Sequence, residues 1–161
     1  MVRRSRSIPA VLLTFLALQT PAAVADTLSL GLSADRDRDA TGAAIEYRWT
    51  GSLVSKPRLE AGWAMAAQAD SNGNAWVGLG VAAAYRLGDS LFVEGSFMPG
   101  YYAEGDDQLG GDSQFRTMLG LGVDISGTDA VSLAVSHFSN GGLDDYNPGA
   151  NTLLLQWTKR F

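Results

Sequence analysis

The stretch F-R-T-M-L-G-L-G-V-D-I, residues 115–125, decides the class of fold. Its odd positions are apolar with one threonine among them, whereas the even positions include Arg116, Gly120, Gly122 and Asp124. Residues i and i+2 of a β-strand point to the same face. The stretch therefore predicts a strand with one apolar face and one face of small and charged residues.

The same alternation recurs along most of the chain, and no convincing helical period interrupts it. It predicts strands at 27–34, 42–50, 58–67, 74–87, 90–103, 113–125, 129–139 and 151–161. Segments of about ten alternating residues separated by turn residues are typical of membrane barrels. The sequence thus predicts an all-β fold, an eight-stranded antiparallel transmembrane β-barrel of the outer membrane.

The even positions distinguish a membrane barrel from a secreted soluble one, which is the alternative. A soluble barrel would present Lys, Glu and Thr to water on that face. Here small residues alternate with charges of both signs: Gly78, Gly80, Ala82, Ala84, Gly120 and Gly122, with Glu46, Arg48, Arg58, Glu60, Glu94, Arg116, Asp124 and Arg160. Such a mixture suits the narrow interior of an eight-stranded barrel, where buried charges must pair. We expect a filled lumen and no pore.

Aromatic residues and connection lengths support the membrane interpretation. We expect an interfacial girdle from aromatic residues near strand ends, namely Trp49, Trp63, Tyr85, Tyr101, Tyr102 and Trp157, and Phe161 is a terminal aromatic. With both termini periplasmic, the connections 35–41, 68–73, 104–112 and 140–150 face outward. A predicted loop at 51–57 is longer than this orientation expects of a periplasmic turn.

The first 25 residues read as a secretory signal peptide, which leaves 26–161 as the barrel domain. Arg3, Arg4 and Arg6 precede a short apolar stretch at 8–18, and an A-x-A cleavage pattern follows at 23–25. Removing those arginines leaves nine basic residues against 17 acidic ones, a poor composition for binding nucleic acid. The chain has no cysteine, so disulfides and thiolate metal sites are excluded.

The chain's single histidine lies at the end of a predicted strand. His137 and Ser139 continue the parity of the apolar residues Val131, Leu133 and Val135, so a base and a hydroxyl share the apolar face. Serine becomes a nucleophile when a neighbouring base removes its proton. This placement suits an esterase whose substrate is a lipid; the alternative is a structural pair at a strand end.

The segment H-x-S-N-x-G at 137–142, followed by Asn147 and Gly149, resembles the outer-membrane lipid A 3-O-deacylases of the PagL family. The resemblance implies Ser139 as nucleophile and His137 as general base, with Asn140, Asn147 and Gly149 shaping the oxyanion and substrate-positioning site and no cofactor. It implies hydrolysis of the ester-linked 3-hydroxyacyl chain of lipid A, in lipopolysaccharide of the outer leaflet.

One position departs from the family pattern, which has a glutamate where this chain has Asn151. An asparagine carbonyl still accepts a hydrogen bond from imidazole but lends it no charge. Asp144 or Asp145 is an alternative orienting group. A non-enzymatic barrel with a structural, adhesive or surface-recognition role is the alternative function, and another lipid ester and homodimerisation stay open.

Two acidic clusters are candidates for cations rather than for catalysis. Residues 35, 37, 39 and 46 are acidic with spacing like a calcium loop, but Ala40 replaces the required glycine. We therefore predict no metal site there. Asp106, Asp107 and Asp112 could approach lipopolysaccharide phosphates through bridging divalent ions.

Overall fold

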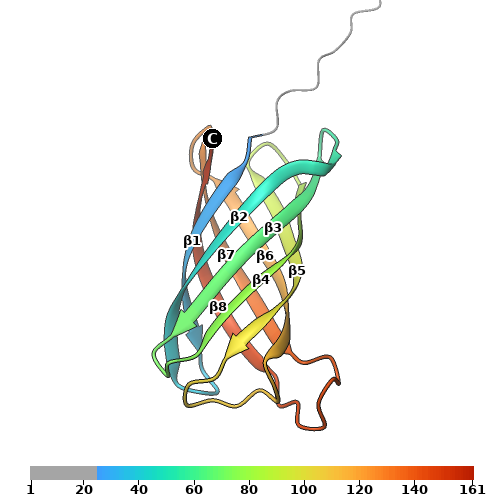
Figure 1. Cartoon of the computed structure of the whole chain (residues 1–161). Helices are drawn as coiled ribbons and strands as arrows, with labels where there is room; N and C mark the ends of the chain where they lie inside the picture. The colour runs from blue at the N-terminus through green and yellow to red at the C-terminus, as the bar shows by residue number, and fades with distance from the viewer. Residues whose placement is uncertain (1–24) are drawn as a thin grey trace, which may run out of the picture.

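A computed structural model describes residues 25–161, and the predicted signal peptide at 1–25 lies outside them except for its last residue. Eight strands form a closed antiparallel barrel in which each strand pairs with its neighbours in sequence and β1 pairs with β8 (Figure 1). The strands are β1 (Thr27–Asp35), β2 (Ala40–Ser55), β3 (Leu59–Asp70), β4 (Ala75–Arg86), β5 (Leu91–Ala103), β6 (Ser113–Asp124), β7 (Asp129–Ser139) and β8 (Ala150–Arg160). The predicted fold class is confirmed.

The two ends of the barrel differ in the length of their connections. Thr27 pairs with Arg160, so the start of β1 and the end of β8 lie at one end, here called the terminal end (Figure 1). That end also carries the turns 56–58, 87–90 and 125–128, whereas the opposite end, here called the loop end, carries 36–39, 71–74, 104–112 and 140–149. The two longest connections therefore lie together at the loop end.

The predicted loop at 51–57 is wrong, because β2 continues to Ser55. Its pairing with β3 shifts register between Trp49 and Val54, and Gly51 in this bulge has a φ of 71°. Ser52 Oγ donates to the carbonyl of Trp49 in β2 and accepts from the amide of Trp63 in β3. This hydroxyl therefore connects the bulge to β3. The connection between β2 and β3 is therefore the turn 56–58, and all three turns at the terminal end are short.

The outward and inward faces follow the predicted parity from β2 to β8, whereas in β1 the even positions face outward. Large apolar side chains are exposed on the outer wall of every strand, among them Leu32, Ile45, Met65, Leu79, Phe97, Leu119, Leu133 and Leu155. Of the predicted girdle, Trp49, Trp63, Tyr85, Tyr101 and Trp157 are exposed. Tyr102 is not a girdle residue, because it is buried in the lumen and its hydroxyl donates to the carbonyl of Asp107. No helix in residues 25–161 is long and apolar enough to cross a bilayer.

The charges in the lumen pair with one another, as predicted. Arg116 Nη1 lies 3.0 Å from Glu46 Oε2, and Arg48 lies 2.6 Å from both Glu46 Oε1 and Glu94 Oε2. Glu46 and Arg116 are each 1% exposed. Removing one partner from such a chain would leave an uncompensated buried charge, which costs about 3–5 kcal/mol. These ion pairs therefore hold the charged side chains of the lumen in place.

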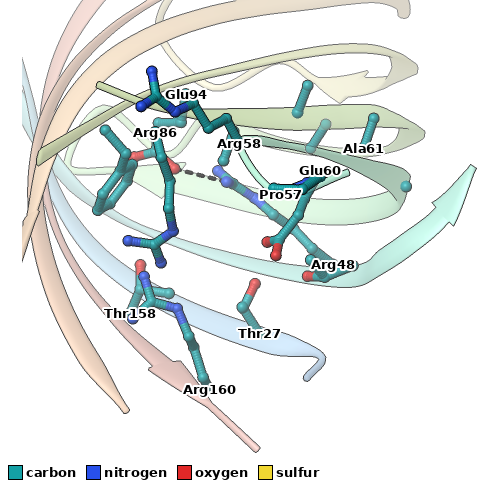
Figure 2. Close-up of a pocket in the computed structure, with 16 residues that line it drawn as sticks. Thr27, Arg48, Pro57, Arg58, Glu60, Ala61, Arg86, Glu94, Thr158 and Arg160 are labelled. Carbon is teal, nitrogen blue, oxygen red and sulfur yellow. Dashed lines mark ion pairs between the residues drawn. The ribbon is translucent and has the colours of Figure 1, made fainter. Parts of the chain in front are cut away.

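A cavity of about 50 Å³ opens in the lumen at the terminal end, and Figure 2 shows the residues that line it. The Arg48–Glu94 ion pair forms part of its wall (Figure 2). Arg86 and Arg160 in the same wall share Asp124, each at 2.6 Å. Arg58 also lines the cavity but lies in the turn 56–58, not in a strand as predicted.

Apolar side chains close the lumen at the loop end. Leu109 folds back from the 104–112 connection and is 1% exposed, in one core cluster with Trp76, Tyr102 and Phe138. The Trp76 and Phe138 rings meet edge to face, with centroids 5.4 Å apart. This packing supports the end of β7 from inside, directly beneath the residues that the sequence singled out.

Candidate active site on the outer wall

His137 projects from the outer wall of β7 near the loop end. Burial alternates along the strand, so Ser136 and Phe138 face the lumen while Val135 and His137 are exposed. The backbone of His137 lies between Thr117 of β6 and Asn151 of β8. From His137 toward the terminal end, the same outer face of these three strands carries exposed apolar residues, namely Leu119, Leu121, Leu133, Val135, Leu153 and Leu155. The imidazole thus lies at the loop-end edge of an apolar wall.

Asn151 binds the imidazole of His137 at Nδ1, which leaves Nε2 available for a proton. His137 Nδ1 lies 2.9 Å from Asn151 Oδ1, and the two residues are direct partners in the β7–β8 ladder. A carbonyl oxygen only accepts, so Nδ1 carries the hydrogen and donates it. A neutral imidazole then has its lone pair on Nε2, which is the nitrogen a general base needs.

Ser139 follows two residues along the same face and is partly exposed. Its backbone pairs with Phe115 of β6. Two residues along a strand are separated by about 7 Å, a span that side chains leaning toward each other can close. In the described part of the chain no hydrogen bond joins Ser139 to the imidazole. Such contacts often tighten only when substrate is bound.

Gly149 packs its backbone against the imidazole. A Cβ at this position would lie 2.9 Å from His137 Cε1 and 3.2 Å from the carbonyl of Phe138. Its φ of 67° also lies in the left-handed region that favours glycine. The residue therefore sets the edge of the pocket in which the ring sits.

We expect Gly149→Ala to lower kcat about 10- to 100-fold, because its Cβ would displace the imidazole, and misplacement by about 1 Å can cost about 10²-fold. Gly111→Ala is the matched control, since Gly111 has a φ of 89° but open space around a Cβ. Both variants place an alanine at a positive φ, so the clash with the imidazole is what distinguishes them. Steady-state kinetics on purified, refolded barrels measures the difference, and equal losses would contradict the clash argument.

Asn140 organises the connection after β7 with its buried side chain. The residue is 1% exposed, its Nδ2 donates to the carbonyls of Gly110 and Tyr146 at 2.9 Å each, and its Oδ1 accepts from the amide of Gly142. Both of its side-chain N–H groups are therefore used. The expected role of Asn140 in the oxyanion site does not fit this arrangement, because it has no donor left to offer.

Asn147 lies exposed in the same connection. Its Oδ1 accepts from the amide of Asn140 at 3.1 Å. Within the described residues its Nδ2 has no hydrogen-bond partner, so both of these N–H groups are free. Asn147 therefore keeps the donor capacity that Asn140 lacks.

Within the described part of the chain, the alternative orienting residues make no hydrogen bond to His137, and the calcium-loop candidates Asp35 and Glu46 have separate partners. Asp144 Oδ1 accepts from the amide of Tyr146, and neither Asp144 nor Asp145 bonds to His137 within residues 25–161. Glu46 binds two arginines in the lumen, whereas Asp35 caps the 36–39 turn, so the acidic residues do not form one calcium loop.

The sequence did not point to Arg38, which lies in the 36–39 turn after β1 and reaches across the barrel seam, the pairing of β1 with β8, to the site. Its Nη2 donates to the carbonyl of Gly149 at 2.7 Å. The two residues are 111 positions apart, and only the pairing of β1 with β8 brings them together. No local motif signals this contact; the predicted closure of the barrel was the only clue.

Comparisons with known proteins agree with this architecture. A family model described as lipid A 3-O-deacylase (PagL) matches residues 42–160, which include His137, Ser139 and Asn151. Lipid A deacylase PagL of Bordetella bronchiseptica is 27% identical over 115 residues, a match that spans 69% of this chain and 65% of that relative.

Solved structures show the same fold. The crystal structure of the outer membrane enzyme PagL has a TM-score of 0.72 at 19% identity, covering 84% of this chain and 99% of that one. A designed transmembrane β-barrel has a TM-score of 0.61 at 9% identity, covering 89% and 98%. The family model matches most of the chain, and the chain therefore belongs to the PagL family of lipid A 3-O-deacylases, with the fold of an outer-membrane β-barrel.

Proposed function

We propose that this protein is a lipid A 3-O-deacylase that hydrolyses the ester-linked 3-hydroxyacyl chain of lipid A from the outer wall of its barrel. Family membership supports the reaction class. The observation that carries the proposal is the His137–Asn151 pair, exposed above an apolar wall at the loop end. With the terminal end in the periplasm, the pair lies at the level of the outer leaflet, where lipopolysaccharide resides.

Ser139 is the proposed nucleophile and His137 its base. Ser139 Oγ attacks the ester carbonyl while its proton passes to His137 Nε2, and the carbonyl oxygen becomes an oxyanion. The tetrahedral intermediate collapses, the sugar hydroxyl leaves with the proton from Nε2, and an acyl-enzyme remains. Water, deprotonated by the same nitrogen, then releases the hydroxy-fatty acid and restores Ser139.

Asn151 and Asn147 supply the supporting roles. Asn151 keeps the hydrogen on Nδ1, so that Nε2 is the basic nitrogen throughout the cycle. Asn147 Nδ2 is the proposed side-chain donor to the oxyanion; a donor aimed at developing charge is worth about 10²–10³ in kcat. Gly149 shapes the pocket edge. No cofactor takes part in this mechanism.

The test is the mass of lipid A from cells that express the chain. Expression of the wild type is expected to remove one 3-hydroxyacyl chain, because the site meets its lipid substrate within the bilayer. His137→Ala is the matched control, since it removes the base from the outer wall and leaves the lumen packing untouched. Unaltered lipid A with a folded wild-type barrel, or equal deacylation with both chains, would favour a non-enzymatic surface role.

A further inference from the structure

Arg38 lies outside the region matched by the family model, which starts at residue 42. It belongs to the 36–39 turn between β1 and β2, at the same end of the barrel as the 140–149 connection (Figure 1). Its Nη2 donates to the carbonyl of Gly149 at 2.7 Å. Gly149 stands just before the β7–β8 ladder, which begins at the pair Phe138–Ala150. The arginine thus bridges the barrel seam at the point where β8 starts.

Two residues, Asp35 and Asn72, hold the arginine in place. Asp35, only 5% exposed, accepts the amide hydrogens of Asp37 and Arg38 on Oδ1, while its Oδ2 lies 3.8 Å from Arg38 Nε. Asn72 Nδ2 donates to the carbonyl of Arg38 at 3.2 Å. Because hydrogen bonds fix the backbone of Arg38 and a buried carboxylate lies near its guanidinium, donating to Gly149 costs less side-chain entropy than it would for a free arginine.

The segment that Arg38 holds is the one that shapes the surroundings of His137. Gly149 packs its backbone against the imidazole edge, since a Cβ there would lie 2.9 Å from Cε1. Two residues later Asn151 Oδ1 lies 2.9 Å from Nδ1 of the same ring. A shift of the Gly149 backbone would therefore disturb the ring at two points. Asn140 fixes the far end of the connection and makes no hydrogen bond to Gly149 among the described residues.

We propose that Arg38 is a positioning residue for the deacylation proposed above: by holding the Gly149 carbonyl, it fixes the imidazole of His137 in its productive orientation. It acts through Gly149 and touches no reacting atom. Its effect therefore falls on the chemical step, not on the binding of lipid.

Arg38→Ala is expected to lower kcat about 10- to 100-fold with KM nearly unchanged, because the ring loses its orientation while the lipid-binding wall stays intact. Arg38→Lys, which keeps a donor, is expected to recover part of the loss. Arg36→Ala is the matched control, since it removes the same charge from an exposed position of the same turn. Kinetics on barrels of equal circular dichroism measures all three.

A second measurement is independent of activity. His137 is the only histidine of the chain, so its ring Cε1–H gives a single assignable NMR signal in lipid bicelles. We expect that signal to shift or broaden in Arg38→Ala, to lie nearer the wild-type position in Arg38→Lys, and to stay unchanged in Arg36→Ala.

Three results would overturn the positioning role. The first is an unchanged ring signal in Arg38→Ala, the second an unchanged kcat, and the third a loss confined to KM, which would make Arg38 a lipid-binding residue. If the wild type deacylates nothing, the proposed function fails, and the ring signal still decides whether Arg38 orients His137.

Discussion

Replacing Ser139 by alanine is expected to lower kcat for deacylation by about 10⁴-fold or more. The variant removes the only hydroxyl that shares the outer face of β7 with His137. Lipid binding should persist, because the apolar wall beneath the site is unaltered. The measurement is single-turnover release of hydroxy-fatty acid from lipid A in mixed micelles, followed by mass spectrometry.

Ser136→Ala provides the matched control on the same strand. Ser136 is buried in the lumen, and its Oγ lies 2.6 Å from Thr152 Oγ1. Its loss should cost stability through one neutral hydrogen bond, about 1 kcal/mol, and leave kcat unchanged. A similar fall in both variants would show that the loss comes from the barrel and not from the nucleophile.

A fluorophosphonate probe tests the nucleophile directly. Attack by Ser139 Oγ forms an O–P bond, expels fluoride and transfers the serine proton to His137. The wild type and Ser136→Ala should gain the mass of the phosphonate, whereas Ser139→Ala and His137→Ala should not. Modification of Ser139→Ala at another residue at the wild-type rate would contradict the assignment.

The barrel could be predicted from the sequence because a membrane imposes a simple rule on every strand. In the strands from β2 to β8 odd positions meet lipid and even positions meet the lumen, whereas β1 has the opposite parity, with Leu30 and Leu32 facing outward. Within any strand, an error of one residue would expose charge to hydrocarbon. The bulge that carries β2 to Ser55 escaped this rule, because it depends on Gly51 and on the hydrogen bonds of Ser52. Tyr102 obeys the rule, since an even position of β5 faces the lumen, and its assignment to the girdle overlooked that parity.

The candidate site was predictable only where it is local in sequence. His137 and Ser139 share a strand face by parity, whereas the place of Asn151 beside the imidazole was implied only by the resemblance to the PagL family, because the long 140–149 connection does not fix the register of β7 against β8. The bonds of Asn140 were not predictable, since they depend on how the 104–112 connection folds over the lumen. Arg38 was also hidden, because sequence distance says nothing about which side chains face each other across the seam.

Asn151→Glu is the second large effect that we expect, in the direction of higher activity. The residue lies directly opposite His137, and its Oδ1 is 2.9 Å from Nδ1. A carboxylate there would accept the same hydrogen and would also stabilise the imidazolium that forms during attack. In a serine triad, changing the acid to its amide costs about 10⁴ in rate. In a site already shaped around asparagine we expect about a 10- to 100-fold rise in kcat.

Two further variants separate charge from fit. Asn151→Asp keeps the side-chain length, so its carboxylate should reach Nδ1 as Asn151 Oδ1 does. A gain in the Glu variant alone would therefore indicate that the added charge is not its cause. Asn151→Leu removes the acceptor and should lower kcat, since Nδ1–H then has no partner. Unchanged rates in all three variants would remove Asn151 from the mechanism and leave His137 without an orienting partner.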